Sequence, residues 1–163
     1  MAFLKYNITP AQIFMGDTGA LLLGLVCSIL AIKFIELHNV LKDSPYTFSS
    51  APSIAIAILI LPLFDTLRVF ILRVLEGRSP FSPDRKHIHH IMIDMGLTHM
   101  QATGVLFAVN IMFIVLAIML QNVGNLILLI ILLGLAFIMT LGASKVVEKK
   151  KSIWSYGVNS TFP

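Results

Sequence analysis

The chain has 163 residues, of which 57% are hydrophobic and only 12% are charged, and its mean hydropathy is +0.90. These values lie outside the range of ordinary soluble domains and predict an integral membrane protein. The net charge of +4 does not indicate a nucleic-acid partner, because most Lys and Arg residues stand near the ends of apolar runs, as is typical of membrane topology signals.

Four apolar segments are long enough to cross a bilayer core of about 30 Å, which needs about 20 helical residues. They do not alternate polar and apolar residues, as the strands of a membrane β-barrel would. The sequence therefore predicts an all-α, polytopic helical membrane protein. The predicted spans are residues 20–37, 51–72, 102–120 and 126–141.

A polar segment, FMGDTG at residues 14–19, directly precedes the first predicted span. Asp17 or Thr18 at this place is typical of a helix N-cap, and a carboxylate there complements the helix dipole. The alternative is a ligand site. Gly16 and Gly19 would then let the backbone approach a ligand closely, and Asp17 would supply an oxygen to magnesium that holds a diphosphate.

The second predicted span contains Pro62, which predicts a kink because proline removes one backbone hydrogen bond. Asp65 and Arg68 follow on one helix face, where an ion pair between them would ease their burial. Alternatively, Asp65 faces a cleft and orients the basic loop that comes next.

That loop, predicted for residues 76–100, contains a second polar segment, SPFSPDRKHIHH at residues 79–90. Neither a helix nor a strand would direct all three of its histidines to one point, so their spacing does not specify a zinc site. Imidazoles beside cations suit an anionic substrate, because they donate hydrogen bonds and take up a proton near phosphate. The alternative is a solvated basic loop that contacts anionic lipid headgroups. The residues concerned are Arg85, Lys86, His87, His89 and His90.

The distribution of basic residues predicts the orientation of the chain. Loop 76–100 is basic, whereas the turn QNVGN at residues 121–125 has no charge, so the positive-inside tendency places the loop in the cytoplasm. With four spans, the residues before position 20 and the basic tail at 145–163 also face the cytoplasm, and both polar segments meet at one face. Thr98 and Gln101 further predict a capping box that opens the third helix.

Several motifs together resemble a known family. In their order along the chain they are similar to the C-terminal half of the bacterial polyprenyl-phosphate N-acetylhexosamine-1-phosphate transferases of glycosyltransferase family 4. The undecaprenyl-phosphate N-acetylglucosamine-1-phosphate transferases are the most similar branch. The motifs are FMGDTGALLLG at 14–24, PLFDTLRVF at 62–70, GRSPFSPDRKHIHH at 77–90 and MGLTHMQA at 95–102.

The resemblance implies a magnesium-dependent reaction in a bacterial cytoplasmic (inner) membrane, with the site on the cytoplasmic face. Undecaprenyl phosphate would attack the β-phosphorus of a UDP-amino sugar and release UMP. On the matching positions, Asp17 would bind Mg²⁺, and His87, His89 and His90 would act in catalysis. The residues expected to assist substrate binding are Gly16, Thr18, Asp65, Arg85 and Lys86.

Members of this family also carry paired aspartates and an Asn/Asp-rich loop in an N-terminal half, and neither is found in this sequence. Residues 1–144 are therefore expected to be the C-terminal part of a transferase domain. The chain would be inactive without the missing half or a partner chain. One alternative is a non-catalytic membrane subunit or scaffold whose basic loop binds membrane lipids. A small metal transporter is disfavoured, because Asn110 is the only strongly polar interior residue of the last two spans.

Overall fold

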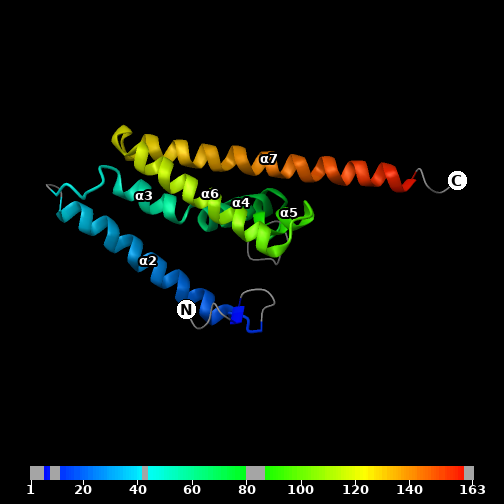
Figure 1. The fold of residues 1–163 in the computed structure, drawn as a ribbon, viewed down its shortest axis with the longest axis horizontal. Helices are drawn as coiled ribbons and strands as arrows, with labels where there is room; N and C mark the ends of the chain where they lie inside the picture. Colours follow the sequence, from blue (N-terminus) through cyan, green and yellow to red (C-terminus); the bar gives the residue numbers. More distant parts are fainter. Residues whose placement is uncertain (1–5, 8–11, 42–43, 80–86, 160–163) are drawn as a thin grey trace.

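The computed structural model describes residues 6–7, 12–41, 44–79 and 87–159, with side chains described up to residue 143 and at Lys145. This part of the chain is built from helices and contains no strand, which confirms the all-α class (Figure 1). The helices are α2 (Gly16–Val40), α3 (Ala51–Ile58), α4 (Ile60–Leu75), α5 (Ile88–Asp94), α6 (His99–Met119), the short 3₁₀ helix η1 (Gln121–Val123) and α7 (Asn125–Asn159).

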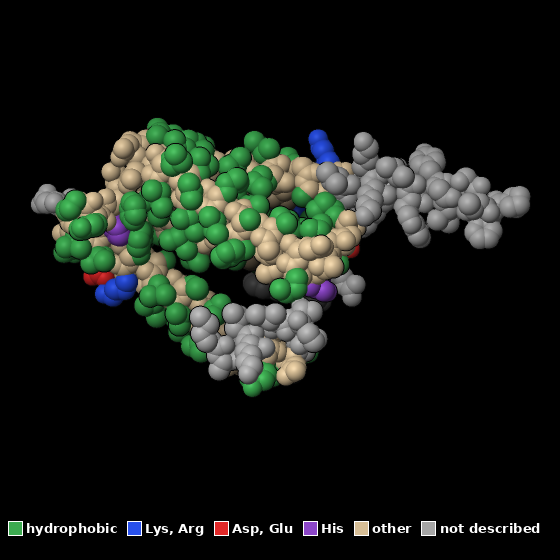
Figure 2. All heavy atoms as spheres, in the orientation of Figure 1, with side chains coloured by type: hydrophobic (Ala, Val, Ile, Leu, Met, Phe, Trp, Pro, Cys, Tyr) green, Lys and Arg blue, Asp and Glu red, His purple; other side chains and the backbone are tan. Residues whose placement is uncertain are grey.

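Within the described ranges, three helical segments are long and apolar enough to cross a membrane by themselves: α2, α6 and the part of α7 from Asn125 to Ala143. They contain or closely match the predicted first, third and fourth spans. Hydrophobic side chains cover much of the outer surface seen in Figure 2, as expected where lipid rather than water surrounds the helices. The chain is thus a polytopic helical membrane protein. α7 continues without a break through residue 145, where the basic tail was predicted to begin.

The second predicted span is divided into α3 and α4, which are bent by 75° relative to each other. The predicted kink is confirmed, but the helix breaks at Leu59, three residues before the proline that causes it. Pro62 has no N–H to donate to the carbonyl of Ile58, so the regular hydrogen-bond pattern cannot continue across this point. At the break itself, the Leu59 N–H donates to the carbonyl of Ile56, three residues earlier, at 3.1 Å rather than to the carbonyl four residues earlier.

The core lies between α3, α4, α6 and α7. Alanines at several of its positions let the helix backbones approach closely, as is common in membrane bundles. α2, by contrast, has no buried residue, and Figure 1 shows it diverging from the other helices toward its N-terminal end. The core residues are Ile54, Ala57, Ile60, Phe64, Phe113, Ala117, Leu128, Leu132 and Ala136.

Polar contacts join the loops at one end of the bundle. The backbone N–H of Ser49 donates to Gln121 Oε1 at 3.2 Å, and the Ser53 hydroxyl donates to the carbonyl of Asn125 at 2.7 Å. The start of α2, the whole of α5 and the start of α6 lie at the opposite end (Figure 1). The two ends of the bundle are therefore distinct, and the start of α2 and residues 87–90 of the second polar segment share one of them.

The entry into α6 has the predicted capping box. The Thr98 hydroxyl accepts a hydrogen bond from the backbone N–H of Gln101 at 3.3 Å, and the Gln101 side chain accepts one from the backbone N–H of Thr98 at 3.0 Å. Two otherwise unpaired donors at the helix start are satisfied in this way. This fixes the position of His99, the first residue of α6.

Candidate functional site

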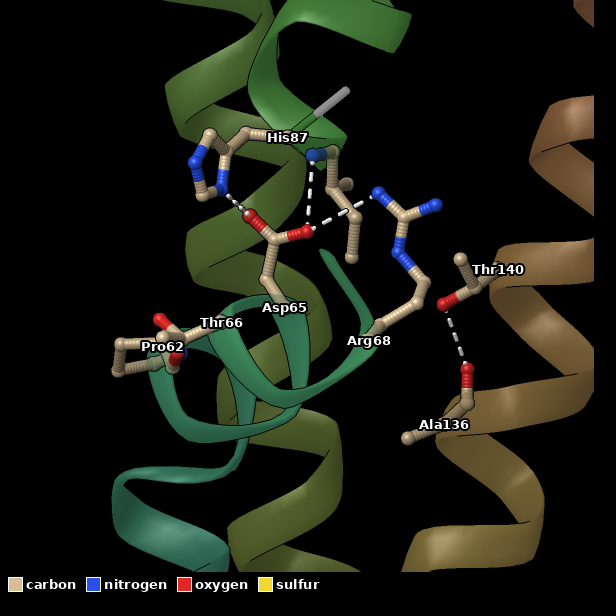
Figure 3. A network of polar contacts seen from close by, with 8 residues as sticks. Pro62, Asp65, Thr66, Arg68, His87, Ala136 and Thr140 are labelled. Atoms are coloured by element: carbon tan, nitrogen blue, oxygen red, sulfur yellow. Dashed lines mark hydrogen bonds and ion pairs between the residues drawn. The ribbon is translucent and has the colours of Figure 1, made fainter. Parts of the chain in front are cut away.

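Asp65, near the start of α4, connects the bent pair of helices to the histidine segment (Figure 3). Its Oδ2 accepts a hydrogen bond from His87 Nδ1 at 2.9 Å, and its Oδ1 accepts one from the backbone N–H of Ile88 at 3.1 Å. Oδ1 also lies 3.2 Å from Arg68 Nη2. The predicted ion pair with Arg68 is confirmed, and Asp65 also contacts His87 and Ile88. That Asp65 faces a cleft and orients the whole basic loop stays a prediction.

The contact with Ile88 explains how α5 can begin where it does. His87 is the N-cap of α5 and has an extended backbone, with ψ of 147°, but its side chain makes no capping hydrogen bond. The first N–H groups of a helix have no partner within the helix. The Asp65 carboxylate, which belongs to α4, accepts the hydrogen bond of the Ile88 N–H at the start of α5. Its negative charge also complements the dipole of α5.

A second polar contact joins α5 to α6. Nε2 of His89 lies 3.3 Å from Nδ1 of His99, and the two rings are stacked with centroids 5.6 Å apart. The His90 ring meets His89 edge-on, with centroids 6.1 Å apart. At 3.3 Å one ring nitrogen donates and the other accepts, so the pair shares a single proton between its facing nitrogens.

These surroundings lower the pKa of His89. Burial is the largest cause, and electrostatic repulsion from the His99 and His90 rings lowers the pKa further. His89 therefore favours the neutral form in the free protein. An anion that approaches the cluster would favour the protonated form and raise the pKa again.

The three predicted histidines do not point to one place. His87 is held by Asp65, whereas His89 is paired with His99. Among the described residues, no three His, Cys, Asp or Glu side chains are grouped so as to hold a metal ion. The arrangement is better suited to several separate hydrogen bonds to an extended anionic ligand than to a closed metal site.

Sequence reasoning missed His99. The signal was present, because the capping box predicted the start of a helix at Thr98, and the topology placed this start on the same face as the histidine loop. What sequence could not provide was the distance between α5 and the start of α6. It also left open which of the three loop histidines would face His99.

At the other polar segment, the prediction that Asp17 or Thr18 caps α2 is wrong. The helix begins at Gly16 and its N-cap is Met15, which makes no side-chain capping bond. Gly16 has a φ of +66°, a conformation that glycine adopts without strain, and the N-cap lies two residues before Asp17 and three before Thr18. Asp17 lies in the first turn with an exposed side chain, where its charge still complements the helix dipole.

Comparison with known proteins identifies the family. The family model described as glycosyl transferase family 4 matches residues 1–35. The chain is 38% identical over 124 residues to a probable undecaprenyl-phosphate N-acetylglucosaminyl 1-phosphate transferase of Bacillus subtilis, a match that covers 75% of this chain and 32% of that protein. The chain belongs to glycosyl transferase family 4. This confirms the resemblance seen in the motifs.

Two further relatives have related names. A decaprenyl-phosphate N-acetylglucosaminephosphotransferase of Mycolicibacterium smegmatis is 33% identical over 110 residues, which cover 66% of this chain and 27% of that protein. An undecaprenyl-phosphate alpha-N-acetylglucosaminyl 1-phosphate transferase of Haemophilus influenzae is 38% identical over 91 residues, which cover 56% of this chain and 23% of that protein. The chain thus spans about a third or less of the length of these relatives. No solved structure matches it.

For a family 4 protein, the fit of Asp17 to magnesium can be judged from its position. Mg²⁺ keeps several waters and is usually bound by one or two carboxylates together with substrate phosphates. An exposed carboxylate in the first turn of a helix, beside N–H groups that favour anions, fits a metal ion shared with a diphosphate. Gly16 and Thr18 are also exposed there. Arg85 and Lys86 lie outside the described residues, so their predicted contribution to this site stays a prediction.

Proposed function

We propose that this chain forms part of the active site of a magnesium-dependent transferase that moves an N-acetylhexosamine-1-phosphate from a UDP-amino sugar to undecaprenyl phosphate and releases UMP. The relatives' names describe undecaprenyl- or decaprenyl-phosphate N-acetylglucosamine phosphotransferases. The observation that carries the proposal is the anchoring of the histidine segment by Asp65 at the end of the bundle where Asp17 lies in the first turn of α2.

In the proposed reaction, Asp17 holds the metal ion, and His87, His89 and His90 bind phosphate oxygens. Magnesium, when bound, supplies Lewis acidity and offsets charge on the diphosphate and on the departing UMP. The pKa of His89 is lowered in the free protein, so its imidazole favours the neutral form there. The negative charge of an arriving diphosphate would raise this pKa and favour uptake of a proton. A charged hydrogen bond to phosphate is stronger than a neutral one.

Arg85 and Lys86 add positive charge beside the histidines in this proposal. Gly16 and Thr18 provide close backbone approach and a hydroxyl at the start of α2. Asp65 has both carboxylate oxygens engaged by Arg68, His87 and Ile88, so its contribution is to orient the histidine segment.

The site lies at the boundary between membrane and water, because a soluble nucleotide sugar must meet a lipid phosphate there. An apolar cavity of about 130 Å³ between α4, α5, α6 and α7 would accept part of the lipid chain. Its lining includes Leu61, Ile88, Val105 and Met139. In the proposal this boundary is the cytoplasmic face of the bacterial inner membrane, and further acidic groups come from a missing N-terminal half or a partner chain.

A chimera tests this function. The matched segment of the Bacillus subtilis relative is replaced by the corresponding residues of this chain, and UMP release is measured in membranes with magnesium, UDP-N-acetylglucosamine and undecaprenyl phosphate. The expected result is UMP release that requires the lipid phosphate. The isolated chain, inserted in the same membranes, is expected to release none. A chimera that inserts and folds but releases no UMP would contradict the proposal and favour a scaffold that only binds lipid.

A further inference from the structure

The carbonyl of Ile58 is left without its helical donor by Pro62, as described above. In a membrane an unpaired carbonyl is costly, because no water is available to replace the lost hydrogen bond. The bend between α3 and α4 therefore requires a donor from elsewhere in the protein.

Asn110 provides this donor. It lies in the middle of α6, 52 positions from Ile58 in the sequence, and its Nδ2 donates to the Ile58 carbonyl at 3.1 Å. The Oδ1 of the same amide is buried and has no hydrogen-bond partner within the described part of the chain. An amide whose oxygen is buried without a partner is less favourable in an apolar helix than a leucine would be. Its presence is explained if its N–H group is needed at the bend.

We infer that Asn110 is a positioning residue that anchors the α3–α4 bend and thereby sets the place of Asp65. Asp65 lies six residues beyond Leu59, which is about 9 Å along a helix that rises about 1.5 Å per residue. A rotation of α4 by about 10° at the break would move the carboxylate by about 1.6 Å. The hydrogen bonds that it accepts from His87 and Ile88 are 2.9 and 3.1 Å long and would not survive this shift.

An amide within the membrane thus controls the histidine segment through Asp65. The geometric part of this inference is independent of the proposed chemistry. Its consequence for catalysis rests on the proposed transfer reaction.

The test is a distance measurement by pulsed electron paramagnetic resonance in lipid nanodiscs. Spin labels are placed at Met119 and Leu75, which are both 77% exposed and lie at the ends of α6 and α4, in a Cys27→Ser background. Leu75 is about 24 Å from the break, so each 10° of rotation of α4 moves its label by about 4 Å. Asn110→Leu is expected to broaden the distance distribution or to shift its mean by up to about 4 Å for each 10° of rotation.

Thr103→Val is the matched control. It also removes a polar group from α6, but the Thr103 hydroxyl bonds to the carbonyl of His99 in its own helix at 2.9 Å. This variant is expected to keep the distribution of the unchanged protein. If Asn110→Leu does not yield folded protein, Asn110→Ala takes its place with the same expectation.

A second comparison separates anchoring of the bend from general packing. Pro62→Ala restores an N–H group that can bond to the Ile58 carbonyl, so Asn110→Leu should have less than half of its effect in this background. The inference is overturned if Asn110→Leu leaves the distance unchanged, or if its effect is equally large with Pro62→Ala present. A chimera that releases no UMP would leave these distances unaltered, so the two proposals fail separately.

Discussion

Asp65 and His87 are separated by 22 positions in the sequence, yet the His87 ring donates to the Asp65 carboxylate at 2.9 Å. The same carboxylate is paired with Arg68, and both side chains of this pair are at most 16% exposed. One acidic group therefore joins the bent helix pair to the segment that carries the other histidines. Its removal should affect both stability and the site.

Asp65→Ala is expected to destabilise the protein by about 3–5 kcal/mol, the cost typical of removing one partner of a buried ion pair, here the carboxylate that pairs with Arg68. The measurement is thermal or denaturant unfolding in detergent. Glu36→Gln is the control, since Glu36 pairs with Lys33 where both side chains are more than half exposed, and its loss should change stability by less than about 1 kcal/mol. Equal effects of the two substitutions would contradict the importance given to Asp65.

Asp65→Asn keeps the size of the side chain but offers one acceptor oxygen where two are used. The oxygen can still accept from the Ile88 N–H, but His87 keeps its contact only by changing tautomer so that Nδ1 accepts from the amide, and the negative charge that favours His87 and Arg68 is lost. In the active chimera we expect UMP release to fall by about 100-fold, the loss typical of a reacting group displaced by about 1 Å. An Asp65→Asn chimera that retains full activity would show that the histidine segment is positioned by other contacts.

Asp17→Asn is expected to lower UMP release severely while leaving the fold intact, since an amide is a much poorer magnesium ligand than a carboxylate. The assay is the chimera's rate as a function of magnesium concentration, with helix content measured by circular dichroism as the control. Survival of activity at ordinary magnesium levels would mean that Asp17 only complements the dipole of α2.

Single replacements of His87, His89 and His90 by Gln should have unequal effects on the chimera, because the three rings face different surroundings. We expect losses of about 100-fold or more for residues that bind a reacting phosphate, with the smallest loss for the exposed His90. Three equal and mild effects would instead favour a loop that only contacts lipid headgroups.

The stability of the protein should depend on pH through His89. The pKa of His89 is lowered in the folded state, first by burial and then by His99 and His90. Between the folded-state pKa and the ordinary pKa of 6.5, the unfolded chain therefore binds more protons than the folded protein. Stability contributed by neutral His89 is therefore present above pH 6.5 and is lost as the pH falls through this window. Unfolding midpoints at pH 7.5 and 5.5 measure the loss.

His99→Gln removes one of the causes of this shift, so the pKa of His89 should rise and the pH dependence should become smaller. Titration of the His89 ring by nuclear magnetic resonance measures the change directly. The control is His38→Gln, which alters a histidine hydrogen-bonded to Phe34 in α2 and should leave the His89 titration unchanged. A His89 pKa that does not respond to His99→Gln would refute the coupling of the two rings.

Much of the architecture followed from the sequence, because its causes are local. A span must hold about 20 apolar residues whatever surrounds it, so α2, α6 and the first part of α7 were predicted close to their observed positions. The capping box at Thr98 and the kink before Pro62 are likewise properties of a few neighbouring residues. The family could also be recognised from motifs along the chain.

Only the tertiary structure decided how distant residues meet. The partner of the Ile58 carbonyl comes from Asn110, the partner of His89 comes from His99, and Asp65 bonds to the backbone of another helix. Periodicity and spacing describe one segment at a time, whereas these hydrogen bonds depend on how two helices pack and at what angle they cross. The local N-cap prediction at Asp17 was wrong because Gly16 enters the helix with a backbone conformation that sequence pattern alone does not reveal.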